Sequence, residues 1–168
     1  VPFDQLDRSV GGLTAIGTYF AGTIRSGTAF GTPASGYRAN TTGEYGPLNA
    51  FILVDGNNQP RFSPRDGTEG TPEAMTANEV RTIIRNALTI AFRARGQIRR
   101  PLGDHAHVTV SVVDTNGAIV GLARTPDGPV FGTDVSLQKA RTAAFFSNRN
   151  AGNELIAGNL GNYVLQVR

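Results

Sequence analysis

The chain has 168 residues and a formal net charge of +3, which fits one domain large enough to bury a core. It contains no cysteine, and this excludes disulfides, thiolate catalysis, iron–sulfur clusters and cysteine zinc sites. No apolar run approaches the roughly 20 residues of a membrane helix, so we expect no membrane span. The chain starts at Val1, which is typical of a processed product and leaves a periplasmic or secreted location open.

Arginine supplies almost all of the positive charge, because Lys139 is the only lysine among 16 basic residues. Six arginines lie between residues 81 and 100. Such a cluster can attract phosphates or carboxylates, but it is also typical of the solvated face of a helix, which we favour. Phe92 is the only aromatic residue among these arginines, whereas single-stranded nucleic acids stack on several aromatic rings. We therefore expect no nucleic-acid partner.

Residues 1–49 are rich in glycine and threonine and show little periodicity. The frequent glycines disfavour a regular helix, because glycine loses the most backbone freedom on ordering. We expect mostly irregular or strand structure here, with one short amphipathic or strand segment at residues 13–24. We interpret residues 1–49 as an extension that packs on a domain formed by residues 50–168.

Two segments follow the same pattern of apolar strand, aspartate and polar turn. The first is a strand at residues 50–54 followed by D-G-N-N, and the second is a strand that ends at Asp114. Either they are a weak internal repeat, or two hairpins obey the same turn chemistry, which we favour. We interpret Asp55 and Asp114 as turn residues whose carboxylates bind nearby backbone N–H groups, rather than as acid–base catalysts.

A capping box predicts the start of a helix at Thr76, because its hydroxyl can accept from the N–H of Glu79 while the Glu79 carboxylate reaches back. Apolar residues then recur at helical spacing at positions 80, 83, 84, 87, 88 and 91. Gly96 is a natural stop. The apolar stripe requires a sheet to pack on.

A β-hairpin is the organising feature of the chain. Apolar runs at residues 108–113 and 118–123 are separated by D-T-N-G, where Asn-Gly supplies the positive φ angles of a tight turn. After a loop rich in proline and glycine, we expect a second helix at about residues 134–147, capped by Thr133 or Asp134.

The second helix carries small and apolar residues on the side that we expect to face a core: Leu137, Ala140, Ala144 and Phe145. The sequence after residue 148 is rich in glycine and asparagine. It ends in a strand-like segment at residues 163–167, which could pair with a sheet edge.

The two histidines, His105 and His107, form His-Ala-His just before the first hairpin strand. Residues two apart point to the same side of a strand, so both imidazoles could bind one metal ion, a haem iron or an anion. A third ligand would come from Asp104 or a remote carboxylate, since no H-E-x-x-H pattern is present. The alternative is a pair of surface histidines at a strand entrance.

Three charged residues lie on the loop and helix that follow the hairpin: Arg124, Asp127 and Lys139. A loop that leaves a hairpin and leads into a helix N-terminus is a natural cradle for an anion. Alternatively, Arg124 could pair with Asp127 or Asp134 and only hold the loop in place. The sequence leaves both interpretations open.

The hairpin and the helix after it share a longer pattern. It reads V-S-V-V-D-T-N-G-A-I-V-G-L-A-R-T-P-D-G, followed by S-L-Q-K-A-R-T-A-A-F-F. Together with the preceding helix it resembles the GlcG-type haem-binding (haem-degrading-like) domain family, over roughly residues 76–147. That family has a helix, a hairpin with V-V-D-x-x-G and a terminal R-x-x-D-G/A, and a helix with K-A-x-T-A.

The resemblance implies an α+β fold with a central antiparallel β-sheet flanked by α-helices, in a profilin-like layering. It also implies frequent homo-oligomerisation and, in some members, a haem or corrinoid-associated ligand near Arg124, Asp127 and Lys139. Haem ligation varies between members, so His105 and His107 are candidates by their chemistry alone. The family's usual final segments, G-G-x-P and a G-x-I-G-V-S-G strand, are missing, so residues 13–24 or another chain could complete the sheet.

These observations predict a non-catalytic binding module, homo-oligomeric or part of a larger assembly, whose ligand is haem or a related tetrapyrrole. The macrocycle would pack on Val130 and Phe131, Arg124 or Lys139 would pair with its propionates, and a histidine would bind its iron. One alternative is a structural or assembly subunit without a small-molecule ligand. Another is an enzyme that acts on a small anionic metabolite or on haem.

Overall fold

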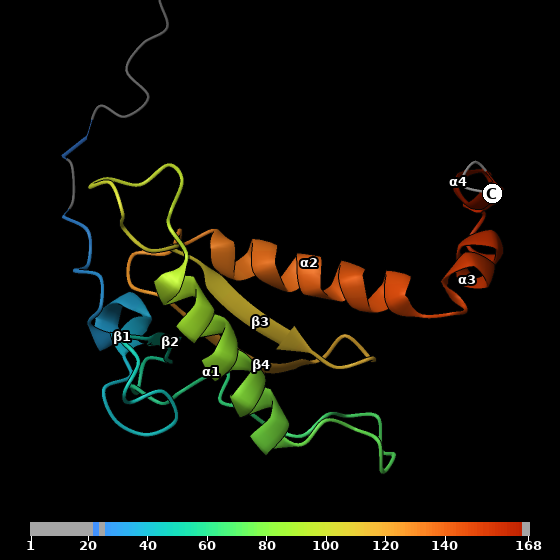
Figure 1. The fold of residues 1–168 in the computed structure, drawn as a ribbon, viewed down its shortest axis with the longest axis horizontal. Coiled ribbons are helices and arrows are strands. Elements are labelled where there is room, and N and C mark those ends of the chain that lie inside the picture. Colours follow the sequence, from blue (N-terminus) through green and yellow to red (C-terminus); the bar gives the residue numbers. More distant parts are fainter. Residues whose placement is uncertain (1–21, 24–25, 166–168) are drawn as a thin grey trace, which may run out of the picture.

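The computed structural model describes residues 22–23 and 26–165, so the segment expected at residues 13–24 lies almost entirely outside the described residues. In chain order, the elements are the 3-10 helix η2 (Pro33–Ser35), β1 (Tyr37–Ala39), β2 (Phe51–Leu53), α1 (Ala77–Arg93), β3 (Thr109–Val113), β4 (Ile119–Arg124), α2 (Gly132–Ser147), α3 (Ala151–Ala157) and α4 (Gly161–Leu165) (Figure 1). The expected strand at residues 50–54 and both hairpin strands are present.

The four strands form one antiparallel sheet in the order β1-β2-β4-β3. Arg124, the last residue of β4, pairs with Thr109 of β3 on one side and with Phe51 of β2 on the other. The expected α+β fold, an antiparallel sheet flanked by helices, is confirmed. β1 comes from residues 1–49, so this part of the chain supplies a strand of the sheet.

β4 is bonded along both of its edges. Beyond the short β2, the chain at residues 62–65 runs beside β4, where the Leu122 N–H donates to the Phe62 carbonyl and the Arg65 N–H donates to the Val120 carbonyl. The residues of β4 from Val120 onward are accordingly all buried. This strand is the centre of the fold.

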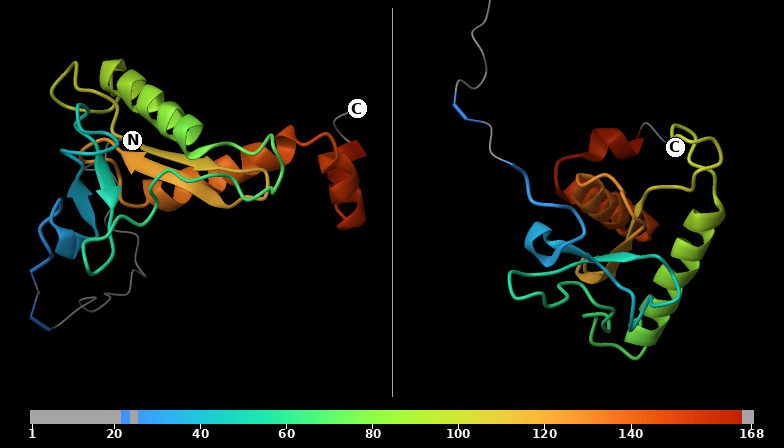
Figure 2. Two further views of the ribbon diagram at one scale, coloured as in Figure 1. Left: turned by 90° about the horizontal axis from the view of Figure 1, so that it is seen from below. Right: turned by 90° about the vertical axis from the view of Figure 1, so that its left-hand side faces the viewer.

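The two long helices cover opposite faces of the sheet, as the two views of Figure 2 show. Successive side chains of a strand point to opposite faces. On β3, Val110 and Val112 pack against the core beneath α1, whereas Ser111 Oγ lies 2.6 Å from Ser136 Oγ of α2. Each helix therefore packs against a different set of β3 side chains.

The apolar core lies between α1 and the sheet. Val80, Ile84 and Leu88 of α1 are fully buried, at the helical spacing that the sequence predicted. Gly121 of β4 allows α1 to lie close to the sheet, because an ideal Cβ there would lie 2.7 Å from side-chain atoms of both Val80 and Ile84. Close packing at this point depends on glycine.

The capping box at Thr76 is confirmed. The Glu79 N–H donates to Thr76 Oγ1 at 3.3 Å, and the Thr76 N–H donates to Glu79 Oε2 at 2.8 Å. The helix ends earlier than expected, at Arg93 rather than near Gly96. The Gly96 N–H instead donates to the carbonyl of Asp104 at 2.7 Å, so this glycine belongs to the connection that follows the helix.

The β3–β4 turn has a different geometry from the one expected. Its positive φ falls on Gly117 (75°) and not on Asn116. The Gly117 N–H donates to the Asp114 carbonyl at 3.0 Å, which describes a type I turn followed by a left-handed glycine. A positive φ at Gly117 alone therefore allows the chain to reverse direction between β3 and β4.

Asp55 and Asp114 act as turn residues, as the sequence predicted. Asp55 Oδ1 accepts from the N–H groups of Asn57 and Gln59, both at 2.9 Å. Asp114 Oδ1 accepts from the Ala118 N–H at 2.8 Å. The second Asp114 oxygen goes further, since Oδ2 accepts from the N–H and hydroxyl of a distant residue, Thr68, at 2.8 and 2.6 Å. Of the two aspartates, only Asp114 is buried and also bonds to a remote loop.

Helix α2 does not start as expected. It begins at Gly132, and its N-cap position is Phe131, which makes no side-chain capping bond. Thr133 and Asp134 are used elsewhere: the Thr133 hydroxyl lies 3.2 Å from the Tyr37 hydroxyl, and Asp134 Oδ1 accepts from the Gln138 amide. The residues expected to face a core are only half-buried, because α2 packs on β3 along part of its length.

The expected strand at residues 163–167 is wrong over residues 163–165, and residues 166–167 lie outside the described part of the chain. Residues 161–165 form the short helix α4, which packs on α3 where Gly152 leaves room for the Val164 side chain. An apolar triplet fits a strand or a helical turn equally well, so its surroundings decide. Here α3 and α4 lie beyond the end of α2, away from the sheet (Figure 1).

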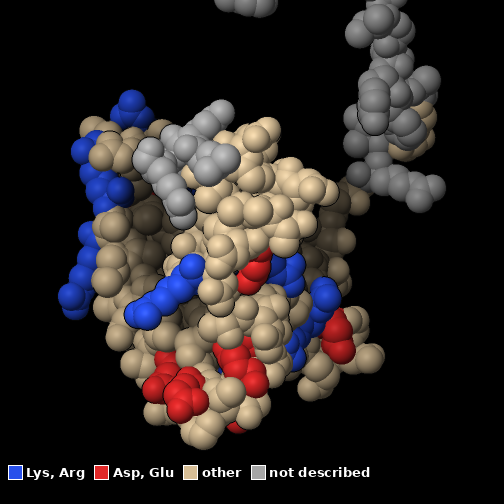
Figure 3. Space-filling model, turned by 90° about the vertical axis from the view of Figure 1, so that its right-hand side faces the viewer, with Lys and Arg blue, Asp and Glu red and all other residues tan. Residues whose placement is uncertain are grey.

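The surface carries both signs of charge. Figure 3 shows basic side chains in a row along one edge of the molecule and acidic side chains gathered elsewhere on the same face. Two of the clustered arginines bind Glu44: Arg81 pairs with its carboxylate at 3.5 Å, and Arg85 donates to its carbonyl at 2.7 Å.

Among the described residues, no helix combines the length and apolar character needed to cross a membrane.

We expect Asp114→Asn to destabilise the fold in a pH-dependent way. Burial by itself would raise the pKa of Asp114, but hydrogen bonds from Thr68 and Ala118 outweigh it and lower the pKa. The charged carboxylate therefore stabilises the native state above about pH 4, and this contribution disappears as the pH falls below the lowered value. Hydrogen bonds to a charged group suggest a loss of about 1.5–3 kcal/mol near neutral pH.

Urea unfolding, measured from neutral pH to below about pH 4, gives the free energy of unfolding of the variant and of the parent. The difference between Asp114→Asn and the parent should shrink in acid, whereas a difference that stays constant would contradict the argument. Asp55→Asn is the matched control, because Asp55 makes the same kind of turn bonds at an exposed position.

We expect Gly121→Ala to lower the free energy of unfolding by about 1–3 kcal/mol, the usual cost of overpacking a core. The added methyl group would meet Val80 and Ile84, which are both fully buried and have little room to move. Thermal or urea unfolding checks this result. In the control variant Gly56→Ala the methyl group has no neighbour within 4 Å. Equal stability of the two variants would refute the close contact.

Candidate functional site

The two histidines lie on the connection between α1 and β3, ahead of the strand itself. This connection is anchored to the end of α1, because the Ala106 N–H donates to the carbonyls of Ala91 and Ala94 at 3.2 and 2.9 Å. An isolated antiparallel bridge also joins Arg95 to His105. The orientation of the imidazoles therefore comes from this anchored connection and not from an early start of β3.

The structure brings His105 and His107 together on one carboxylate. Asp104 Oδ1 lies 3.1 Å from His105 Nδ1, and Asp104 Oδ2 lies 3.0 Å from His107 Nε2. The two rings are stacked, with centroids 4.6 Å apart and planes inclined by 24°. One ligand atom from each of the three residues lies within 4.8 Å of the others. We call these three residues the Asp-His-His cluster.

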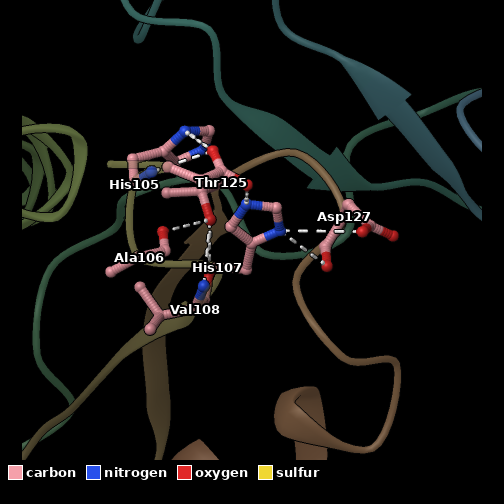
Figure 4. A network of polar contacts seen from close by, with 7 residues as sticks. His105, Ala106, His107, Val108, Thr125 and Asp127 are labelled. Carbon is pink, nitrogen blue, oxygen red and sulfur yellow. Dashed lines mark hydrogen bonds and ion pairs between the residues drawn. The ribbon is translucent and has the colours of Figure 1, made fainter. Parts of the chain in front are cut away.

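The second ring nitrogen of His107 contacts the loop after β4. His107 Nδ1 lies 3.4 Å from the Asp127 carbonyl oxygen and 3.6 Å from Asp127 Oδ2 (Figure 4). On the other side of the ring, Nε2 lies 3.0 Å from Asp104 Oδ2 and donates to this carboxylate, which can only accept. His107 is thus oriented with Nε2 toward Asp104.

Thr125 fastens the histidine segment to the end of β4. Its hydroxyl accepts from the Val108 N–H at 2.9 Å and donates to the Ala106 carbonyl at 3.0 Å, so it binds the backbone on both sides of His107 (Figure 4). Thr125 is fully buried. No local pattern in the sequence marks this threonine, because its hydroxyl bonds to a carbonyl 19 positions away.

His105 has one nitrogen without a partner. Its ring packs on Phe92 with centroids 4.9 Å apart, and Nδ1 faces Asp104. His105 Nε2 is buried and makes no hydrogen bond with the part of the chain that the structure describes. A buried polar atom of this kind costs stability unless something else binds it.

Asp104 stays ionised under mild conditions. Its partial burial would raise the pKa, but the hydrogen bond from the His105 N–H and the two nearby imidazoles lower the pKa of Asp104 below its usual value. A carboxylate that is already deprotonated does not have to lose a proton before it binds a cation.

Arg124 forms no ion pair within the described residues, so its expected alternative role as a partner of Asp127 or Asp134 is wrong. Asp127 turns to His107 and is exposed, and Asp134 binds Gln138. The Arg124 guanidinium instead lies over two aromatic rings, 4.6 Å from the centroid of Tyr37 and 5.2 Å from that of Phe30. Burial lowers the pKa of Arg124, in part offset by Tyr37 and Asp127.

Other residues of interest lie apart from these groups. Lys139 is exposed on α2, and no hydrogen bond or ion pair of the described chain connects it to Arg124 or Asp127. Phe131 and Val130 are 71% and 63% exposed, so the loop before α2 presents an apolar surface to solvent. Tyr37 and Phe30 could not be predicted from the sequence, because no pattern connects the glycine-rich N-terminal segment with a residue of β4.

An open cleft of about 830 Å³ lies at the opposite end of the hairpin. It is lined by the β3–β4 turn, the end of α2 and α3, including Asn116, Arg141 and Glu154. None of the histidines, Arg124, Asp127, Phe131 or Lys139 lines it. This cleft and the candidate metal ligands are therefore separate features.

Comparisons with protein-family models, with curated proteins and with solved structures found no match to this chain.

Proposed function

We propose that this chain is a binding module that holds one first-row divalent metal ion on the Asp-His-His cluster. The observation that carries the proposal is the convergence of a carboxylate oxygen and two imidazole nitrogens within 4.8 Å. In a tetrahedral site with bonds of about 2.1 Å, ligand atoms lie about 3.4 Å apart. Side-chain rotations of His105 and His107 would have to bring the ligand atoms, which now lie within 4.8 Å of one another, to that spacing.

The donor set selects the kind of metal. Imidazoles suit zinc, iron, cobalt and nickel, whereas calcium and magnesium prefer oxygen ligands alone. Asp104, His105 and His107 fill three positions and leave at least one for water or for a ligand from solution. We propose binding without catalysis, with the open position available for recognition.

The surroundings support this assignment. The Asp127 carbonyl at His107 Nδ1 is the type of outer contact that orients metal-binding histidines in proteins. His105 Nδ1 and His107 Nε2 both face the Asp104 carboxylate, so one nitrogen of each ring points into the cluster.

We expect the chain to bind one Co²⁺ or Zn²⁺ ion. Isothermal titration with Zn²⁺ and visible absorption of Co²⁺ measure the affinity and the ligand field. Asp104→Asn should weaken binding at least tenfold, in keeping with losses of about 10–100-fold for changes around metal sites. Affinity should also fall as the pH is lowered, because metal binding requires neutral imidazoles.

The chain offers a clean set of controls for this titration. His105→Ala/His107→Ala removes every imidazole of the 168 residues and should abolish saturable binding. Asp134→Asn removes an exposed carboxylate outside the cluster and should leave binding unchanged. Undiminished Co²⁺ binding by the double variant would refute the proposal.

The second candidate is haem or a related tetrapyrrole, the ligand that the family resemblance implies. One observation favours it: the exposed Val130 and Phe131 belong to the same loop as Asp127, which contacts His107. An imidazole would bind the iron, these apolar residues would cover the macrocycle, and Arg124 or Lys139 would pair with its propionates. Haem would supply a redox-active iron when bound.

A haemin titration followed at its main visible absorption band separates the two candidates. Saturable binding that weakens in Phe131→Ala and in the histidine double variant would favour haem over a free ion. Binding of neither haemin nor Co²⁺, together with a large particle in light scattering, would favour the alternative of an assembly subunit, whether homo-oligomeric or part of a larger complex.

A further inference from the structure

Arg124 is an unusual buried charge. Its exposed fraction is 0%, and none of Nε, Nη1 and Nη2 makes a hydrogen bond within the described part of the chain. A guanidinium carries five N–H donors and keeps its charge in proteins. Buried charges are normally paired, because removing an ion from water without compensation is costly.

The aromatic rings compensate only in part. Tyr37 and Phe30 lie over the guanidinium and attract its positive charge through their ring faces. Such contacts do not replace the hydrogen bonds that the N–H groups would donate, because these groups point outward in the guanidinium plane. The in-plane donors of Arg124 therefore remain available to an acceptor.

A second unsatisfied group lies next to Arg124. Thr109 is the direct partner of Arg124 in the β3–β4 ladder, and its buried Oγ1 makes no hydrogen bond with residues 22–23 or 26–165. Each of the two side chains lies close to a glycine: Gly128 in the loop before α2, or Gly132 at the start of α2. An ideal Cβ at Gly128 would lie 3.2 Å from Arg124 Nη2, and one at Gly132 would lie 3.6 Å from Thr109 Oγ1.

We propose that Arg124 and Thr109 form a binding site for the carboxylate group of a small organic acid. The guanidinium donates two parallel hydrogen bonds to the two carboxylate oxygens, and the Thr109 hydroxyl donates a third. A planar monoanion matches one planar cation between flanking rings. A tetrahedral phosphate is bulkier and carries more charge than this site neutralises. The site is distinct from the Asp-His-His cluster and does not depend on metal binding.

The Phe30 ring covers the Arg124 guanidinium. Tyr37 is part of β1 and its hydroxyl contacts Thr133, so it stays in place. Phe30 precedes the sheet, is 44% exposed, and is held mainly by ring contacts with Tyr37 and Phe51, each at 5.4 Å between centroids. Rotation of Phe30 away from Arg124 opens the guanidinium to an anion, and the ring then competes with the ligand for the same position.

Acetate is the probe for this site, with inorganic phosphate as the comparison. In the full chain labelled with ¹⁵N-arginine, the Nε–Hε signal of Arg124 should shift saturably with acetate, while the signals of the exposed arginines stay unchanged. Phe30→Ala should bind acetate several-fold more tightly, because it removes the competing ring. Thr109→Val should bind it several-fold more weakly.

Arg124→Met tests the guanidinium itself and should lower acetate affinity at least tenfold. Arg61→Met is the matched control, because Arg61 also lies 5.2 Å over an aromatic ring but is exposed. Because Arg124→Met can fail to fold, the Arg124 signal and the Phe30→Ala affinity test the proposal without it. No acetate shift at Arg124 in either the parent or Phe30→Ala would overturn the proposal, and so would tighter binding of phosphate than of acetate.

Discussion

The antiparallel pairing of β3 with β4 is the constraint on which the rest of the structure depends. β4 is bonded along both edges, and its register places Arg124 opposite Thr109 at the open end of the hairpin. At the closed end, Asp114 fastens the loop that contains Thr68. One ladder therefore positions a structural aspartate at one end and the candidate binding groups at the other.

Arg124, the last residue of β4, and Thr125, which follows it, contact different parts of the molecule. Thr125 turns toward the histidine segment and binds its backbone, whereas the preceding Arg124 turns toward Tyr37 and the start of α2. Asp127 follows and contacts His107. Two proposed sites with different chemistry thus share one short loop, so a change in that loop can affect both without any direct contact between them.

Local chemistry explains which parts of the fold could be predicted. The capping box at Thr76 and the turn bonds of Asp114 involve residues close in the chain, so pattern alone identifies them. The prediction for α2 was inaccurate at its start, because Thr133 is engaged by Tyr37 from a remote strand. The C-terminal segment became α4 because its apolar residues found α3 rather than a sheet edge. Long-range partners are not visible in periodicity.

The sequence by itself determined the hairpin, the amphipathic helix α1, and the adjacency of Asp104, His105 and His107 along the chain, because each depends on neighbours within a few residues. Only the tertiary structure decided the surroundings of these residues. It brought the Asp127 carbonyl to His107, and it left Arg124 fully buried beneath Phe30 and Tyr37 without an acidic partner among the described residues. The physical reason is that the burial of a side chain and the compensation of its charge depend on which distant segments contact it. Those contacts are fixed only when the whole sheet has formed with its strands in register.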